Sequence, residues 1–271
     1  MNHLPQSSRS APHLTPARLV GQRFGPRPFG DITIALVGYC PRPRSLDRYQ
    51  PRPTTDQYFI HVPPANVEIC RYGDAEFLSI THVYGGPVSA ALIEELAYYG
   101  ITAVLAYGLA GGLGRTPQKM GDFYIIERAL ALDGTTPHYT PEKVIPADEG
   151  LNAKIKDLAK ATGFPHLMPV QAMTGDAIYR EYDEELNAAK ASGCDIVNCD
   201  SSHLFAVSRA VGIRSTECGV LSDVATGSGE DWQSTLAVML SADGQAALDP
   251  LALVGKIVAF YVEVVVPELK S

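Results

Sequence analysis

Two aspartates stand where short apolar runs end, and these positions are the first that could carry chemistry. Asp200 follows residues 195–199 and directly precedes a helical pattern, while Asp223 follows residues 218–222. A carboxylate before a helix can cap the helix, or it can accept hydrogen bonds from a diol such as ribose. An acid at the carboxyl end of a buried strand suits proton donation. Read alone, each acid is more commonly a cap or turn residue.

A glycine-rich segment, Gly-Leu-Ala-Gly-Gly-Leu-Gly at residues 108–114, follows an apolar run. Glycines there allow positive φ and let a ligand approach the backbone closely, although a tight structural turn is the commoner role. A dinucleotide-binding fingerprint requires a helix directly behind the glycines. Pro117 and Gly121 interrupt this region, so the fingerprint fits poorly.

A run of arginines follows the first apolar segment, which ends at Gly38; the run comprises Arg42, Arg44, Arg48 and Arg52. Such a run is usually a solvated face, but its place after a glycine makes anion binding a real alternative. His82 lies between apolar residues and is interpreted as a core histidine. His138 lies near a loop, where it could reach a ligand or a subunit contact.

Length and composition indicate one large α/β domain that binds a small molecule. The chain has 271 residues, 46% of them hydrophobic and 19% charged, which is an ordinary globular balance. The net charge of −8 argues against nucleic acid and against an anionic membrane as partner. The five cysteines have no zinc-ligand spacing, so they are interpreted as free thiols in a reducing cytoplasm, and no metal is expected.

The domain prediction assigns residues 1–30 to a flexible N-terminal arm and residues 31–271 to a single catalytic domain. The first segment is rich in Pro, Ser and Arg and lacks the apolar core of a secretory signal. We find no apolar run of about 18 residues, the length that a membrane helix needs. The sequence therefore predicts no membrane segment.

Strands alternate with helices along the domain. We expect strands at 31–39, 101–108, 121–132, 194–200 and 215–224, a hairpin at 67–86 that turns at 72–74, and helices at 87–100, 149–162, 184–192, 202–212, 232–248 and 249–264. This alternation predicts an α/β fold with a mixed, mostly parallel central sheet flanked by helices. In such sheets ligands collect beyond the carboxyl ends of the strands.

Taken in order, several segments resemble the purine nucleoside/uridine phosphorylase superfamily, which also holds methylthioadenosine nucleosidases. The resemblance runs roughly from Asp31 to the C-terminus. It is carried by THVYGGPVSAALIEEL, AVLAYGLAGGLG, GDFYIIERALALDGTTPHY, TGDAIYREY, VNCDSS and VLSDV. The interval from Asp200 to Asp223 is also similar to that between the family's ribose-binding glutamate and its purine-protonating aspartate.

The resemblance implies roles for individual residues. Asp200 would bind the ribose hydroxyls, and Asp223 would protonate N7 of a purine as the glycosidic bond breaks. The other substrate-binding residues that it implies are Cys199 and Tyr84 beside the sugar, Ile178 and Val197 along the base, and Gly108. Gly38 and Arg42 correspond to the family's phosphate loop.

The implied activity is cleavage of the N-glycosidic bond of a purine-type nucleoside. Phosphate is the expected acceptor and co-substrate, giving free base and pentose 1-phosphate, and no cofactor is implied. Ala106 and Leu109, however, stand where phosphorylases carry an arginine and a serine or threonine that contact phosphate. The resemblance further implies a homo-oligomer, either a dimer or a trimer of dimers.

Two alternatives stay open. GLAGGL is similar to the GSAGGL of the family's hydrolases, which use water, but no acid precedes Asp47 in the stretch where those enzymes place a glutamate. A non-catalytic nucleoside-binding protein on the same scaffold is the other alternative. The pair Asp200 and Asp223 argues against it, because binding alone needs no proton donor.

Overall fold

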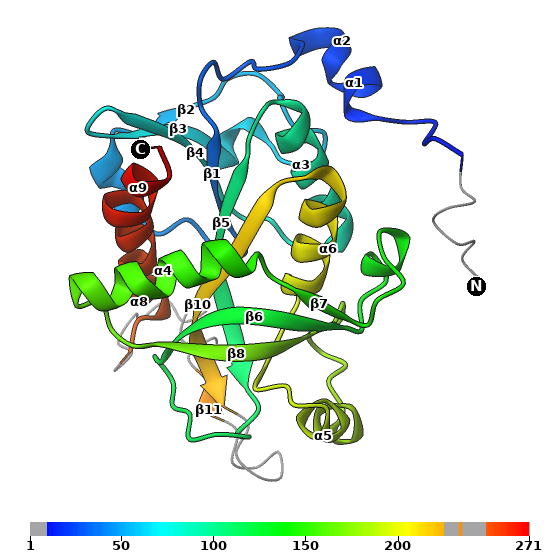
Figure 1. The fold of residues 1–271 in the computed structure, drawn as a ribbon, viewed down its shortest axis with the longest axis vertical. Coiled ribbons are helices and arrows are strands. Elements are labelled where there is room, and N and C mark those ends of the chain that lie inside the picture. The colour runs from blue at the N-terminus through cyan, green and yellow to red at the C-terminus, as the bar shows by residue number, and fades with distance from the viewer. Residues whose placement is uncertain (1–9, 225–232, 235–247, 271) are drawn as a thin grey trace.

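The computed structural model describes residues 10–224, 233–234 and 248–270. Within them, one sheet of eleven strands forms the centre of the molecule (Figure 1). The strands are β1 (Ile34–Gly38), β2 (Arg52–Pro53), β3 (Val67–Tyr72), β4 (Ala75–Ile80), β5 (Ala103–Gly112), β6 (Phe123–Ala131), β7 (Val144–Pro146), β8 (Leu167–Thr174), β9 (Ile196–Asn198), β10 (Arg214–Val224) and β11 (Gln233–Ser234).

The helices cover both faces of this sheet. They are α1 (Pro16–Leu19), α2 (Gly21–Phe24), α3 (Gly86–Tyr98), α4 (Glu149–Thr162), α5 (Asp183–Ala191), α6 (Ser201–Val211), α8 (Pro250–Phe260) and α9 (Val266–Lys270). Strands β4, β1, β5 and β10 pair in parallel, whereas β2, β3, β7 and β11 pair antiparallel at the margins. The predicted mixed α/β fold class is confirmed.

Two apolar layers hold the helices to the sheet. Leu92 and Ile93 of α3 and Leu204 of α6 belong to one buried cluster with Val104 and Ala106 of β5. Ile155 of α4 and Val254 and Ile257 of α8 belong to a second cluster with Leu105 and Tyr107 of the same strand. Side chains of β5 alternate between the two layers, as the period of a strand buried on both faces requires.

Five strands close on themselves around the lower half of the sheet in Figure 1. The order β10-β6-β8-β9-β5 returns to β10, because β5 pairs with β9 on one side and with β10 on the other. One expectation is corrected by this arrangement, because the first three glycines of the glycine-rich segment lie inside β5 rather than in a turn. Strand β9, which precedes Asp200, does not pair with β10, which carries Asp223, because β5 lies between them.

Two glycines lie side by side where β5 meets β10. Gly219 of β10 pairs with Gly108 of β5 on one side and with Tyr124 of β6 on the other. A Cβ atom at Gly219 would lie 2.6 Å from the carbonyl oxygen of Gly108 and would overlap the Tyr124 hydroxyl. The strands can therefore hold this spacing only without a side chain at Gly219.

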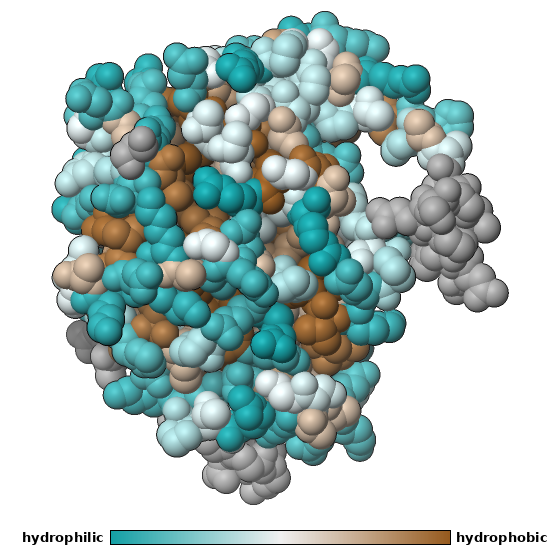
Figure 2. All heavy atoms as spheres, in the orientation of Figure 1, coloured by the Kyte–Doolittle hydropathy of each residue, from teal (hydrophilic) through white to brown (hydrophobic). Residues whose placement is uncertain are grey.

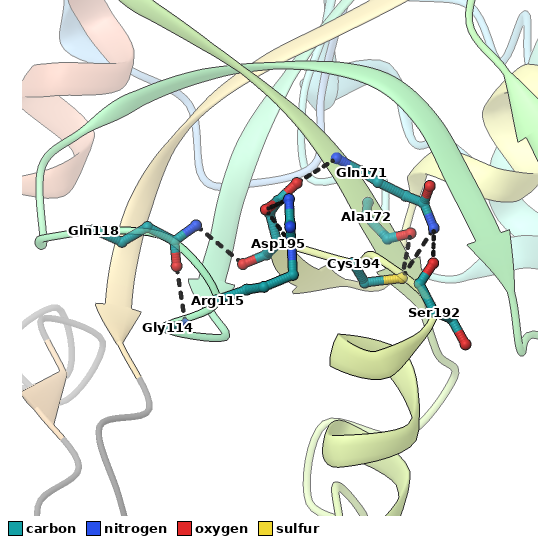
Figure 3. Close-up of polar contacts among 8 residues, drawn as sticks. All are labelled: Gly114, Arg115, Gln118, Gln171, Ala172, Ser192, Cys194 and Asp195. Atoms are coloured by element: carbon teal, nitrogen blue, oxygen red, sulfur yellow. Dashed lines mark hydrogen bonds and ion pairs between the residues drawn. The ribbon is translucent and has the colours of Figure 1, made fainter.

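A polar network fixes the entry to β9 (Figure 3). One carboxylate oxygen of Asp195 accepts a hydrogen bond from Arg115 Nε at 2.8 Å, and the other accepts from the backbone N–H of Gln171 at 3.0 Å. The Asp195 carbonyl accepts from Gln118 Nε2 at 3.0 Å, and Gln118 Oε1 accepts from Gly114 N–H at 3.0 Å. This network ties the segment after β5 to β8 and β9, and so sets where Val197 to Asp200 lie.

Part of the predicted arm packs on the domain. Between residues 10 and 30, α1 and α2 are helical, and Val20 and Phe29 are buried in the layer under α3. Phe29 contacts the rings of Tyr58 and Tyr99, because an aromatic side chain at this point is better buried than solvated. Residues 1–9 lie outside the described residues, and the domain boundary at residue 31 stays a prediction.

The C-terminal part differs from expectation in two ways. Gln233 and Ser234, inside the predicted helix at 232–248, form strand β11; the other residues of that prediction lie outside the described residues, apart from Leu248, which precedes α8. The continuous helical run Pro250–Lys270 is long and apolar enough to cross a membrane, contrary to the sequence prediction, but 56% of its most apolar window is buried inside the protein. Packing against the sheet accounts for that apolar character.

The molecular surface agrees with this interpretation. On the face drawn in Figure 2, hydrophilic residues are spread over all the elements, and apolar areas lie between them. Polar residues distributed in this way over one face fit a protein whose most apolar segments face inward.

The paired glycines give a first prediction. Gly219→Ala should lower the free energy of unfolding by about 1–3 kcal/mol, because the added methyl group meets backbone and a buried ring rather than a flexible side chain. Gly150→Ala in α4 is the matched control, since its Cβ would have only the Asp148 carboxylate in contact, at 3.5 Å. Urea denaturation of both variants measures the difference; equal stabilities would contradict the steric argument.

The Asp195 network gives a second prediction. Asp195→Asn should cost about 1–3 kcal/mol of stability, because its amide nitrogen would face either Arg115 or the Gln171 N–H, both of which are donors. Glu142→Gln breaks the exposed ion pair with Arg209 and should change stability by only about 0–0.5 kcal/mol. Thermal unfolding compares the two. A loss of stability in the control as large as that in Asp195→Asn would show that the network contributes no more to stability than an exposed ion pair.

Candidate active site

Asp200 lies between β9 and α6 and does not cap the helix. It occupies the N-cap position of α6, yet its side chain forms no capping hydrogen bond. Only 6% of the residue is exposed. Burial raises the pKa of the Asp200 carboxyl well above its usual range, and the nearby carboxyl of Glu217 raises it further. The carboxyl is therefore held in the interior without the structural role that the sequence offered as its alternative.

Glu217 is the functional candidate that the sequence analysis missed. It lies in the middle of β10 and is fully buried. Its Oε2 accepts a hydrogen bond from Ser201 Oγ at 2.9 Å, and its Oε1 accepts from Asn198 Nδ2 at 3.3 Å. Burial raises its pKa to about 7. The signal was present in the sequence, because an acid between Thr216 and Cys218 is out of place in a strand buried on both faces.

The space over Gly108 brings Glu217 close to the tyrosine that follows β1. A Cβ atom on Gly108 would lie 3.6 Å from Glu217 Oε1 and 3.4 Å from Tyr39 Cβ. The Tyr39 hydroxyl is hydrogen-bonded to Ser89 Oγ at 2.7 Å, which fixes the ring. Burial raises the pKa of the Tyr39 hydroxyl well above its usual range, and the charge of Asp200 adds to this effect. Gly108 thus lies beside Glu217 and Tyr39.

Asp223 lies in β10, which pairs with β5 on the side opposite to β9. It follows a β-bulge at Ser222, whose Oγ donates a hydrogen bond to Asp223 Oδ1 at 2.7 Å. Asp223 Oδ2 lies 2.9 Å from the position that a Cβ atom of Gly111 would take, and Val197 Cγ1 lies 3.1 Å from the same point. Bulges commonly re-aim a side chain beside an active site. Here the bulge brings Asp223 and Val197 together over Gly111.

A cavity of about 710 Å³ adjoins these residues, and Val197, Cys199 and Glu181 are among its lining residues. The pKa of Cys199 is raised to about 12 by burial, with Asp200 and Glu181 as further causes. The pKa of Glu181 is raised to about 7 by loss of solvent and by Asp223. Cys199 and Glu181 thus line one cavity, the first within the electrostatic influence of Asp200 and the second within that of Asp223. Glu181 was not singled out from the sequence, where it is one acid among several in residues 176–185.

The remaining predicted substrate residues lie more openly. Tyr84 is 52% exposed, but its hydroxyl is close enough to Cys40 and Asp200 for their charges to add to the effect of burial, which raises its pKa to about 12. Ile178 is 54% exposed and does not line the cavity. The roles assigned to Tyr84 and Ile178 stay predictions. His82, interpreted as a core residue, is exposed and has a φ of 57° in the turn after β4.

The predicted phosphate loop holds its arginine in two ion pairs. Arg42 Nε donates to Glu68 Oε2 at 2.8 Å, and Arg42 Nη1 donates to Asp47 Oδ1 at 2.7 Å. Gly38 ends β1 against the Tyr107 ring, which lies 2.8 Å from the position of a Cβ atom. Two carboxylates therefore already compensate the charge of Arg42. Among the residues that the structure describes, no group of three His, Cys, Asp or Glu side chains is arranged to hold a metal ion.

Comparison with known proteins places the chain in a family. The sequence matches the Phosphorylase superfamily over residues 39–258. An uncharacterised protein of Acanthamoeba polyphaga mimivirus is 30% identical over 227 residues, which are 83% of this chain and 88% of that protein.

Solved structures share the fold. Purine nucleoside phosphorylase from Toxoplasma gondii, in complex with immucillin-H, aligns with a TM-score of 0.69 at 18% identity, over 84% of this chain and 88% of that one. The 5′-methylthioadenosine/S-adenosyl homocysteine nucleosidase of Campylobacter jejuni aligns with a TM-score of 0.63 at 19% identity, over 85% and 96%. The chain therefore belongs to the phosphorylase superfamily.

Proposed function

We propose that this protein cleaves the N-glycosidic bond of a purine-type nucleoside. The observation that carries the proposal is the placing of Asp200 after β9 and of Asp223 in β10, the two strands that pair with opposite sides of the glycine-rich half of β5, next to a cavity lined by Cys199 and Glu181. Bond cleavage builds positive charge on the sugar and electron density on the base. Asp200 is suited to the ribose hydroxyls, and Asp223 to protonation of the departing base. Both phosphorylases and nucleosidases occur among the structural relatives.

The surroundings of Gly108 favour water as the acceptor. Ala106 and Leu109 supply no donor at the positions where the resemblance expects phosphate ligands. The carboxyl of Glu217 lies beside Gly108, where it would repel an anion. Arg42 is already paired with Glu68 and Asp47. Absence of two phosphate ligands would weaken anion binding by about 2–5 kcal/mol.

Phosphate, the acceptor expected from the sequence, is the second candidate. Its support is the loop between Gly38 and Arg42, which keeps an arginine at the end of β1. We still expect that the protein forms a homo-oligomer, is located in the cytoplasm and uses no cofactor. A nucleoside is the small-molecule partner that we propose, in agreement with the family.

The two acceptors are separated by an assay of the purified protein. Inosine, adenosine and methylthioadenosine, with uridine as a pyrimidine comparison, are incubated with and without phosphate, and free base and sugar products are resolved by chromatography. We expect purine base and free sugar in phosphate-free buffer. Release only with phosphate, giving a sugar phosphate, would favour the second candidate. Binding without release would indicate a non-catalytic protein.

Asp223 gives a prediction for the chemical step. Asp223→Asn should lower kcat for a purine nucleoside by about 10²–10⁴-fold, because an amide of the same shape cannot donate a proton as an acid does. The exposed Asp157→Asn in α4 should keep the parent rate. Circular dichroism establishes that both variants fold. A folded Asp223→Asn variant with the parent rate would remove Asp223 from the proposed mechanism.

A further inference from the structure

Three buried polar groups gather around the space over Gly108. The carboxyls of Glu217 and Asp200 influence each other's protonation, and the Tyr124 hydroxyl is close enough to have its pKa raised by both, after the larger effect of burial. Among the described residues, Tyr124 Oη has no hydrogen-bond partner although it is fully buried. A buried hydroxyl without a partner indicates a place for a water molecule or a ligand oxygen.

The Glu217 carboxyl is held in a fixed orientation. Ser201 and Asn198 each donate to a different oxygen of this group, and both belong to the segment that carries Asp200. Within the described part of the chain, no lysine or arginine forms an ion pair with Glu217 or Asp200. A buried carboxylate without a cation retains its capacity to accept a proton or to face developing positive charge.

We propose that Glu217 is the general base that activates the attacking water in the space over Gly108. This inference rests on the proposed function. Water oxygen forms a bond to C1′ of the sugar, and the water proton passes to Glu217. The C1′–N bond breaks, its electron pair goes to the base, and the proton of Asp223 goes to the departing base. The products are the free sugar and the free base, so that atoms and charges balance.

Position supports this role for Glu217 over the other acids. Asp200 is close enough to Glu217 for that carboxyl to raise its pKa, but Asp200 is the acid that the resemblance assigns to the sugar hydroxyls. Asp223, which belongs to β10, lies beside Gly111, and Gly111 is three residues further along β5 than Gly108. Glu217 Oε1 lies 3.6 Å from the position of a Cβ atom on Gly108. Glu217 is therefore the acid that we expect to contact a water molecule between the sugar and the sheet.

The pH dependence follows from the titratable groups that interact electrostatically with Glu217. These are Asp200, Tyr39 and Tyr124, and, from the opposite face of the sheet, Cys40, Cys218 and Tyr261. Burial raises the pKa of every phenol and thiol among them, so these groups stay neutral near pH 7. Because burial also raises the pKa of Glu217 to about 7, its carboxylate, the form that accepts a proton, increases as pH rises through that value. Turnover should therefore rise with pH below about 7.

The test compares Glu217→Gln with Glu95→Gln. Glu95 in α3 is a matched control, because it is 3% exposed, its pKa is likewise raised to about 7 by burial, and it accepts hydrogen bonds from the Ile60 N–H. We expect Glu217→Gln to lower kcat by about 10²–10³-fold in phosphate-free buffer and to lose the rise of rate with pH. Glu95→Gln should keep both. Formate, a small exogenous base, should restore part of the rate of Glu217→Ala.

The outcomes separate this inference from the proposed function. No base release by the parent protein would overturn both. Cleavage by the parent with an unchanged rate and pH profile in folded Glu217→Gln would overturn only the role of Glu217. If neither Glu217 variant folds, the pH profile and solvent isotope effect of the parent decide: a flat profile without an isotope effect overturns the role, and a rise near pH 7 with an isotope effect supports it.

Discussion

Strand β5 is paired with β10 along its whole length and is paired on its other side before and after residues 108–110, and the other features of the candidate site follow from this arrangement. β10 runs along its whole length, β1 pairs with its first half, and β9 pairs with its end. A strand so enclosed can offer space to a ligand only by omitting side chains. Gly108 and Gly111 provide that space, one beside Glu217 and the other beside Asp223.

The same enclosure explains why the acids are unusual. Desolvation of a carboxylate costs several kcal/mol in a real protein, and a neighbouring acid adds repulsion. Asp200 lowers this penalty by retaining a proton, as its strongly raised pKa indicates, whereas Glu217, with a pKa raised to about 7, is present in both forms near neutral pH. Ser201 and Asn198 provide hydrogen bonds to Glu217, but a pair of apolar residues would pack there at lower cost. Retention of two such acids is understandable where they act on a ligand.

The sequence predicted most of the elements because their boundaries carry local signals. Asp148 before α4 and Gly163 after it cap that helix, and its predicted bounds match the observed ones. The closure of β5 against both β9 and β10 could not be predicted, since it depends on contacts between distant strands. Asp200 and Asp223 were found because they stand at strand ends. Glu217 was not, because its neighbours Asn198 and Ser201 come near it only through the folded sheet.

The region around Gly108 differs from an anion-binding site in several ways, and each difference weakens the binding of an anion. The side chains of Ala106 and Leu109 provide no hydrogen-bond donor, Glu217 adds an acceptor, and Glu68 and Asp47 compensate the charge of Arg42. Any one of these features would weaken phosphate binding. Together, on our proposal, they make the region beside Gly108 favour water over an anion. An anion would meet the acceptor Glu217 without finding hydrogen-bond donors, whereas water could donate to Glu217 and accept from Tyr124. Water, which is neutral and forms hydrogen bonds, is therefore the nucleophile that we propose for these surroundings.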